Sequence, residues 1–136
     1  MGHIFIGIEI GGTKIQVFIT DEDHNIIERD KFFVKEKEAA FITKNLKERL
    51  ITYCQKYSVE AIGVGFGGPI DYQKGVVKTS HHISGWSDFP LAEWISDETG
   101  APVSVDNDAN TAALAEACLG AGKDFSRVFY VTMGSG

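Results

Sequence analysis

The residues best suited to chemistry stand together at the start of a predicted helix, where the sequence reads Asp106-Asn107-Asp108. A carboxylate at the carboxyl end of a strand can accept a hydroxyl proton, and Asn107 could hydrogen-bond to neighbouring hydroxyl groups. A helix N-cap needs only one polar side chain, so three such residues exceed what capping requires. The alternative is a simple cap in which the helix dipole favours acids, and this is our interpretation of Asp106. Asp108 is therefore the candidate catalytic base.

A second candidate site is the turn Gly11-Gly12-Thr13-Lys14, which interrupts two strand-like stretches. Adjacent glycines allow backbone dihedrals that other residues resist, so amide groups can align toward an anion. Thr13 adds a hydroxyl group, and Lys14 adds a charge that faces either phosphates or solvent. Glu9, just before the turn, could hold Mg²⁺ through water. The order Thr-Lys excludes a Walker motif, and an ordinary hairpin with two glycines is the alternative.

A third candidate site is glycine-rich, because residues 63–68 read GVGFGG and match the pattern GxGxxG after a predicted strand. A dinucleotide-binding fingerprint should then open a helix, but residues 69–75 are typical of a loop, so we reject that interpretation. The glycines instead predict a chain that passes close to a small ligand. His81 and His82 have no third ligand at metal-binding spacing, so no zinc site is expected in this chain.

The elements that position these residues follow from hydrophobic periodicity. Apolar residues that alternate with other types predict strands over 4–10, 15–19 and 26–34, joined as an antiparallel meander. Apolar spacings of three and four predict a helix over 37–57. The elements predicted after it are a strand at 61–66, a short strand at 76–77, a helix from 90 to Gly100, a strand at 102–105, a helix at 109–119 and a strand at 128–132. This order indicates a mixed sheet with helices on its faces.

Composition limits the classes of function that the chain can have. Its 136 residues are 43% hydrophobic and 24% charged, which suits one compact domain. The net charge of −6 argues against nucleic acid as a partner, because phosphate binding requires concentrated Lys and Arg. An apolar run of roughly eighteen residues does not occur, so we expect no membrane span. The first residues lack the basic flank of a signal peptide, so we expect a cytoplasmic location.

The three candidate sites, in this order, resemble the repressor–ORF–kinase (ROK) family of sugar kinases and sugar-responsive repressors. Residues 8–14 resemble the family's first phosphate motif, and residues 63–71 are similar to its strand and substrate loop. Residues 105–116 (VDNDANTAALAE) closely match its Asn-Asp signature, and residues 131–136 are similar to the opening of its second phosphate loop. The resemblance covers nearly the whole chain.

The resemblance implies an α/β, ribonuclease-H-like fold of the actin, heat-shock ATPase and sugar-kinase type. Residues 1–136 would form the N-terminal lobe, and the C-terminal lobe, with the family's zinc site, would be absent. The implied reaction is phosphoryl transfer from ATP with Mg²⁺ to a hydroxyl of a glucose-like hexose, by a protein that is a homodimer at full length. Asp108 would be the base and Glu9 the metal residue. The implied sugar contacts are Gly68, His82 and Asn107, and the implied phosphate contacts are Gly11, Gly12, Thr13, Lys14, Gly134, Ser135 and Gly136.

Several positions depart from the family pattern. Glu9 stands where the family usually has Asp, and His82 stands where an Asn commonly approaches the sugar. Pro69 replaces an Arg of the N-acetylmannosamine kinases, which disfavours that substrate.

Other functions are also compatible with the scaffold. One alternative is a non-catalytic sugar-sensing module, and another is a ROK transcriptional regulator without its DNA-binding segment. A first strand that begins by Ile4 leaves no room for an N-terminal helix-turn-helix, which favours the kinase. The Asn107-Asp108 pair disfavours an actin-like filament protein. We expect little activity from the chain alone, because phosphoryl transfer needs both lobes to close over ATP.

Overall fold

The computed structural model describes residues 2–133, which form a five-stranded mixed sheet, a two-stranded ribbon and three helices. The five strands are β1 (Ile4–Ile10), β2 (Lys14–Thr20), β3 (Ile26–Phe33), β4 (Val59–Phe66) and β7 (Val103–Asn107). The ribbon consists of β5 (Ile70–Asp71) and β6 (Val76–Val77), and the helices are α1 (Ala39–Lys56), α2 (Leu91–Thr99) and α3 (Asp108–Leu119).

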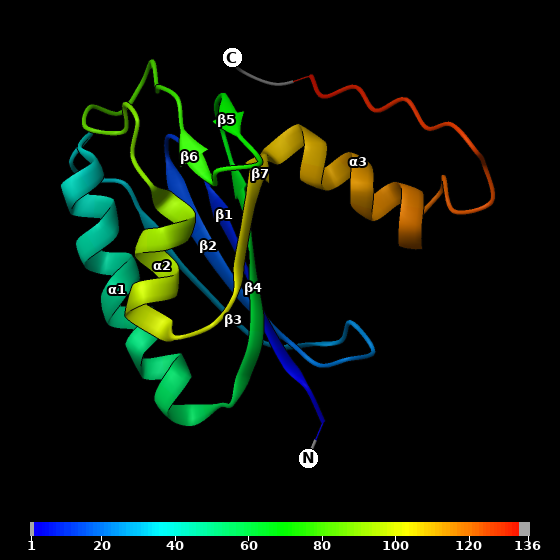
Figure 1. Ribbon diagram of the computed structural model, residues 1–136, viewed down its shortest axis with the longest axis horizontal. Helices are drawn as coiled ribbons and strands as arrows, with labels where there is room; N and C mark the ends of the chain where they lie inside the picture. The colour runs from blue at the N-terminus through cyan, green and yellow to red at the C-terminus, as the bar shows by residue number, and fades with distance from the viewer. Residues whose placement is uncertain (1, 134–136) are drawn as a thin grey trace.

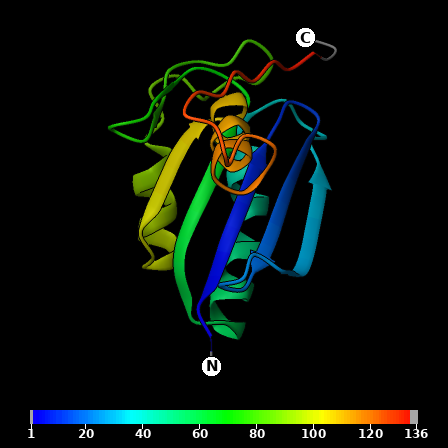
Figure 2. The same ribbon diagram turned by 90° about the vertical axis from the view of Figure 1, so that its right-hand side faces the viewer.

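The strand order in the large sheet is β3-β2-β1-β4-β7. The first three strands form the predicted antiparallel meander, whereas β4 pairs in parallel with β1, and β7 pairs in parallel with β4. Figure 2 looks onto this sheet and shows the five strands side by side. The carboxyl ends of β1, β4 and β7 therefore lie at the same edge.

Helices α1 and α2 cover one face of the sheet, and α3 projects from the other side (Figure 1). Alternate residues of β2 point into the core under α1 and α2, with Ile15, Val17 and Ile19 fully buried. Helix α1 places Ile42, Leu46 and Leu50 against them, at the spacing of four that brings side chains onto one face. No residue of α3 is buried, and the helix packs on the sheet mainly against β4 and β7.

The strand predicted over residues 128–132 is wrong. These residues form no ladder in the described part of the chain, and Phe129 is 91% exposed. Alternating apolar residues favour a strand, but a strand forms only where a neighbour accepts its backbone hydrogen bonds. Among residues 2–133, no strand of either sheet pairs with this segment. Within the same residues, no helix is both long and apolar enough to cross a membrane.

Polar contacts attach the edge strand β3 to α1. The Tyr53 hydroxyl donates to Asp30 Oδ2 at 3.1 Å, and Arg49 Nε lies 3.1 Å from the same oxygen. The Arg49 guanidinium also stacks over the ring of Phe32, 4.3 Å from its centroid. Burial, followed by the hydrogen bond to Asp30, raises the pKa of Tyr53 to about 12.

This raised pKa predicts a loss of stability at high pH. The fold favours the neutral phenol, so the contribution of Tyr53 is complete below the unfolded pKa of about 10 and is lost as pH rises toward 12. Urea unfolding of the wild type and Tyr53→Phe from pH 8 to 11.5 should show a difference in free energy that shrinks above pH 10. Tyr72→Phe, which removes an exposed phenol, is the control. A wild-type advantage over Tyr53→Phe that stays constant with pH would contradict the assignment.

Candidate functional site

The three candidate sites meet at the edge where β1, β4 and β7 end. In the sheet register Ile10 lies beside Phe66, and Phe66 lies beside Asn107. The turn after β1, the loop after β4 and the start of α3 follow directly from these three positions. Segments about fifty residues apart in the sequence thus form one site, as expected where the carboxyl ends of parallel strands meet.

Asn107, not Asp106, caps helix α3. Its Oδ1 accepts a hydrogen bond from the Ala109 amide at 2.9 Å, which is the N-cap geometry. Asp106 Oδ1 instead accepts from the Asn107 amide at 2.7 Å and from Asn110 Nδ2 at 3.1 Å. The expectation that Asp106 is the cap is therefore wrong, because α3 begins at Asp108 and Asn107 is the residue directly before it.

Asn107 also joins α3 to the loop after β4, because its Nδ2 donates to the Gly68 carbonyl at 2.9 Å. Gly68 itself is closely packed, since an added methyl group would lie 3.0 Å from Phe66 Cε1 and 3.3 Å from the Thr79 carbonyl. Two of the three predicted sugar residues are thus in direct contact. The third, His82, is exposed and lies beside the turn, with its Cβ 3.7 Å from a methyl group placed on Gly12.

Asp108 is exposed, and its carboxylate lies close to the turn after β1. A methyl group added at Gly67 would lie 3.4 Å from Asp108 Oδ2, 3.4 Å from the Ile10 carbonyl and 3.8 Å from Gly11 Cα. Gly67 therefore occupies the narrow space between the candidate base and the candidate phosphate turn. Its amide donates to Ile10 O at 2.9 Å, which joins the two loops.

The turn at residues 11–14 is held by its carbonyl groups. Thr13 O accepts from the Val34 amide at 2.8 Å, and the Gly11 amide donates to Lys14 O at 3.2 Å. Within residues 2–133, the amides of Gly12 and Thr13 donate to no protein acceptor, so both are available to an anion.

The expected reason for the two glycines of this turn is wrong, because neither Gly11 nor Gly12 has a positive φ. At Gly11 the constraint is close packing instead, since an added methyl group would lie 3.3 Å from Lys14 O.

Two residues near this turn were not among the site residues predicted from the sequence. Lys37 Nζ donates to the Gly12 carbonyl. From the sequence alone, Lys37 is an ordinary charged residue near the start of a predicted helix. Gln16 lies opposite Glu9 in the β1–β2 register, and its Nε2 donates to Glu9 Oε2 at 3.0 Å. The period of two alone places Gln16 on one face of β2, but only the register shows that it contacts the candidate metal residue.

Lys14 opens β2 and is exposed. By strand alternation it lies on the same face of β2 as Gln16. Its charge is therefore on the sheet face that carries Glu9. Gly134, Ser135 and Gly136, the remaining predicted phosphate residues, lie outside the described residues.

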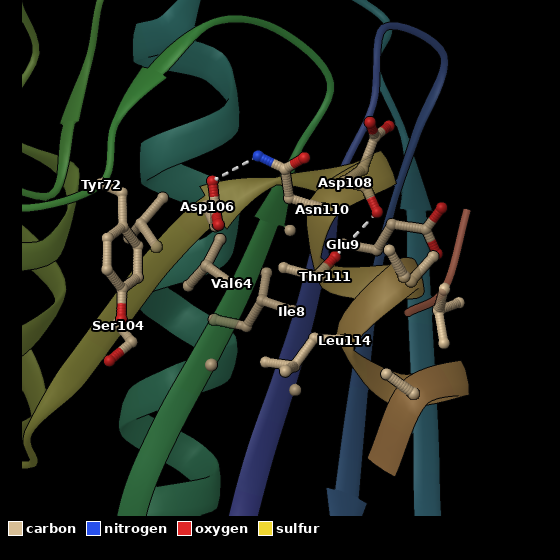
Figure 3. Close-up of a pocket in the computed structure, with 18 of the residues that line it drawn as sticks. Ile8, Glu9, Val64, Tyr72, Ser104, Asp106, Asp108, Asn110, Thr111 and Leu114 are labelled. Carbon is tan, nitrogen blue, oxygen red and sulfur yellow. Dashed lines mark hydrogen bonds between the residues drawn. The ribbon is translucent and has the colours of Figure 1, made fainter. Parts of the chain in front are cut away.

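A cavity of about 980 Å³ lies between the open sheet face and α3. Glu9, Asp106 and Asp108 border it together with apolar residues such as Phe18 and Leu114. Figure 3 shows the Asp108 carboxylate directed up and away from the cavity, toward the loops at the sheet edge. The cavity therefore shares Glu9 and Asp108 with the site, whereas residues 11–14, Gly68, His82 and Asn107 lie on the loop edge outside it. Among residues 2–133, no group of three or more metal-ligating side chains is present.

A sequence model of the ROK family matches residues 5–136. The glucokinase of Halalkalibacterium halodurans is 35% identical over 97% of this chain and 42% of its own length. The chain thus spans less than half the length of this curated relative.

Solved structures agree with this match. A ROK glucokinase from Streptomyces griseus, in complex with glucose and AMPPNP, is 34% identical and has a TM-score of 0.76, covering 88% of this chain and 38% of its own. A ROK transcriptional regulator, a homologue of the E. coli MLC protein, reaches a TM-score of 0.83 over 92% of this chain and 33% of its own. Its identity of 22% bears on the fold alone. The predicted α/β, ribonuclease-H-like fold of the actin and sugar-kinase type is confirmed.

Proposed function

Because the chain belongs to the ROK family, we propose that it is the N-terminal lobe of a kinase that transfers the γ-phosphoryl group of ATP to a hydroxyl of a glucose-like hexose. One observation carries the proposal. The exposed carboxylate of Asp108 lies next to a turn whose Gly12 and Thr13 amides are available to an anion. Only Gly67 lies between this carboxylate and the turn. A base this close to a phosphate-binding turn suits the transfer of a phosphoryl group between two small bound substrates.

Asp108 acts as the general base in this proposal. Its carboxylate takes the proton of the sugar hydroxyl while the hydroxyl oxygen forms a bond to the γ-phosphorus of ATP. The bond from that phosphorus to the bridging oxygen of the β-phosphate breaks, and ADP leaves with the electron pair. General-base assistance supplies about 10²–10⁴ in rate, and the rest comes from positioning and charge neutralisation.

Gly68, Asn107 and His82 hold the sugar in this proposal. Asn107 already uses its amide oxygen in the helix cap and one N–H in the bond to Gly68. An amide nitrogen carries two N–H donors, so the second can reach a sugar hydroxyl. The two internal bonds fix its direction, which favours selection of one hydroxyl orientation.

Gly11, Gly12, Thr13 and Lys14 hold the phosphates in this proposal, with Gly134, Ser135 and Gly136 as a second loop. A magnesium ion that arrives with ATP needs only one or two protein carboxylates, because the phosphates and water complete its coordination. Glu9 fits that requirement, since its carboxylate is exposed and oriented by Gln16. When bound, the ion neutralises phosphate charge. Cytoplasmic location and a full-length homodimer complete the proposal.

The direct test is an ADP-release assay of the complete protein with ATP, Mg²⁺ and a panel of glucose, fructose, mannose and N-acetylmannosamine. We expect turnover that depends on glucose or a close analogue, and little turnover from residues 1–136 alone. Calorimetry that detects sugar binding without nucleotide binding or turnover would instead favour a sensing module. Robust turnover by residues 1–136 alone would contradict the two-lobe mechanism.

A further inference from the structure

Two glycines of β4 face the same side of the sheet but meet different surroundings. Gly63 and Gly65 are two residues apart in the strand, so both lie on the face toward α3. A methyl group added at Gly63 would meet no atom within 4 Å. At Gly65 the same group would lie 2.8 Å from Thr111 Oγ1, 3.5 Å from Asp108 Cα and 3.7 Å from Asp108 Cβ. The first turn of α3 therefore rests directly on the Gly65 backbone.

Both Gly65 and Thr111 are held in place by hydrogen-bonded neighbours. Gly65 lies between Glu9 of β1 and Asp106 of β7 in the register, so strands on both sides fix its backbone. On the other side, Thr111 Oγ1 donates to the Asp108 carbonyl at 2.9 Å, which ties the hydroxyl to the same helical turn. Rotating the Thr111 hydroxyl away from an added methyl group would break this bond, so we expect the start of α3, where Asp108 lies, to shift instead.

We propose that Gly65 is a positioning residue for Asp108, which rests on the proposed function. The missing side chain lets the first turn of α3 approach β4 closely enough to hold the Asp108 carboxylate beside Gly67 and the phosphate turn. Gly65 does not have a positive φ, so alanine can adopt its backbone conformation. The effect of a substitution is then steric and directed at α3. A displacement of about 1 Å at a reacting group costs on the order of 10²-fold in rate.

The test compares Gly65→Ala with Gly63→Ala, its matched control on the same face of the same strand, in the complete kinase. We expect kcat of Gly65→Ala to fall by about 10- to 100-fold, with KM for ATP changed by less than about twofold, because the phosphate turn is not part of α3. Gly63→Ala should keep both constants. The double variant Gly65→Ala/Thr111→Ala removes the obstructing hydroxyl and should recover most of kcat, whereas Thr111→Ala alone should have a small effect.

The outcomes separate this inference from the proposed function. Unchanged kcat in Gly65→Ala, with an active wild type, overturns the positioning role and leaves the kinase assignment intact. A double variant that folds but gains nothing over Gly65→Ala also overturns it. If Gly65→Ala and Gly65→Ala/Thr111→Ala both fail to fold, Gly65 acts in stability, and the positioning role is overturned as well. An inactive wild type would contradict the proposed kinase function, and the positioning role that rests on it would be overturned too.

Discussion

Replacing Asp108 by asparagine in the complete kinase is expected to lower kcat by about 10²–10⁴-fold. Asparagine has nearly the same shape but cannot accept the proton of the sugar hydroxyl at neutral pH. The fold should survive, because the Asp108 carboxylate is exposed and Asn107 provides the helix cap. Steady-state kinetics give kcat, and calorimetry with glucose should show sugar binding within a few fold of the wild type.

Asp106→Asn is the matched control for this prediction. Asp106 lies two residues earlier and has the same charge, but its Oδ1 is already occupied by the Asn107 amide and Asn110 Nδ2. An asparagine oxygen can accept the same two bonds, so kcat should change by less than about threefold. Equal losses in the two variants would indicate a general effect of charge rather than a base at Asp108. Turnover unchanged in Asp108→Asn would exclude the proposed mechanism.

The meander and the helices could be predicted from the sequence because they depend on local patterns. Period-two alternation and spacings of three and four reflect which face of each element is buried, and this burial is the main driving force for folding. Gly100 ends α2 with φ of 75°, as the predicted stop requires. Chain order alone, however, does not show that β4 lies between β1 and β7, and this placement brings the Gly11 turn and Asp108 together.

The details of the site depend on distances that local patterns do not contain. Gly12 and Thr13 were predicted to face an anion, and their amides are available, but positive φ is not the reason. Gln16 and Lys37 were missed because each acts across a strand register or from a separate element. Close packing of glycines against a neighbouring element depends on tertiary contacts rather than on backbone preference.

Gly75 shows how large the effect of such packing should be. Gly75 lies in the turn of the β5–β6 ribbon with φ of 66°, and its carbonyl accepts from the Ala92 amide of α2 at 3.0 Å. A methyl group added there would lie 2.3 Å from Ala92 Cβ. Left-handed strain and overpacking act together, so Gly75→Ala should lower the free energy of unfolding by about 3 kcal/mol.

Gly100→Ala separates the two contributions, because Gly100 has a similar φ of 75° but an added methyl group meets nothing within 4 Å. Strain alone should cost about 1 kcal/mol. Urea unfolding of residues 1–136, followed by circular dichroism, measures both variants, and small domains of this size usually unfold in one cooperative transition. The reciprocal variant Gly75→Ala/Ala92→Gly restores the space between ribbon and helix, so its loss should be smaller than that of Gly75→Ala despite the lower helix propensity of glycine. Equal losses in Gly75→Ala and Gly100→Ala would mean that the ribbon does not pack closely on α2, whereas the expected difference of about 2 kcal/mol locates the effect at the Ala92 contact.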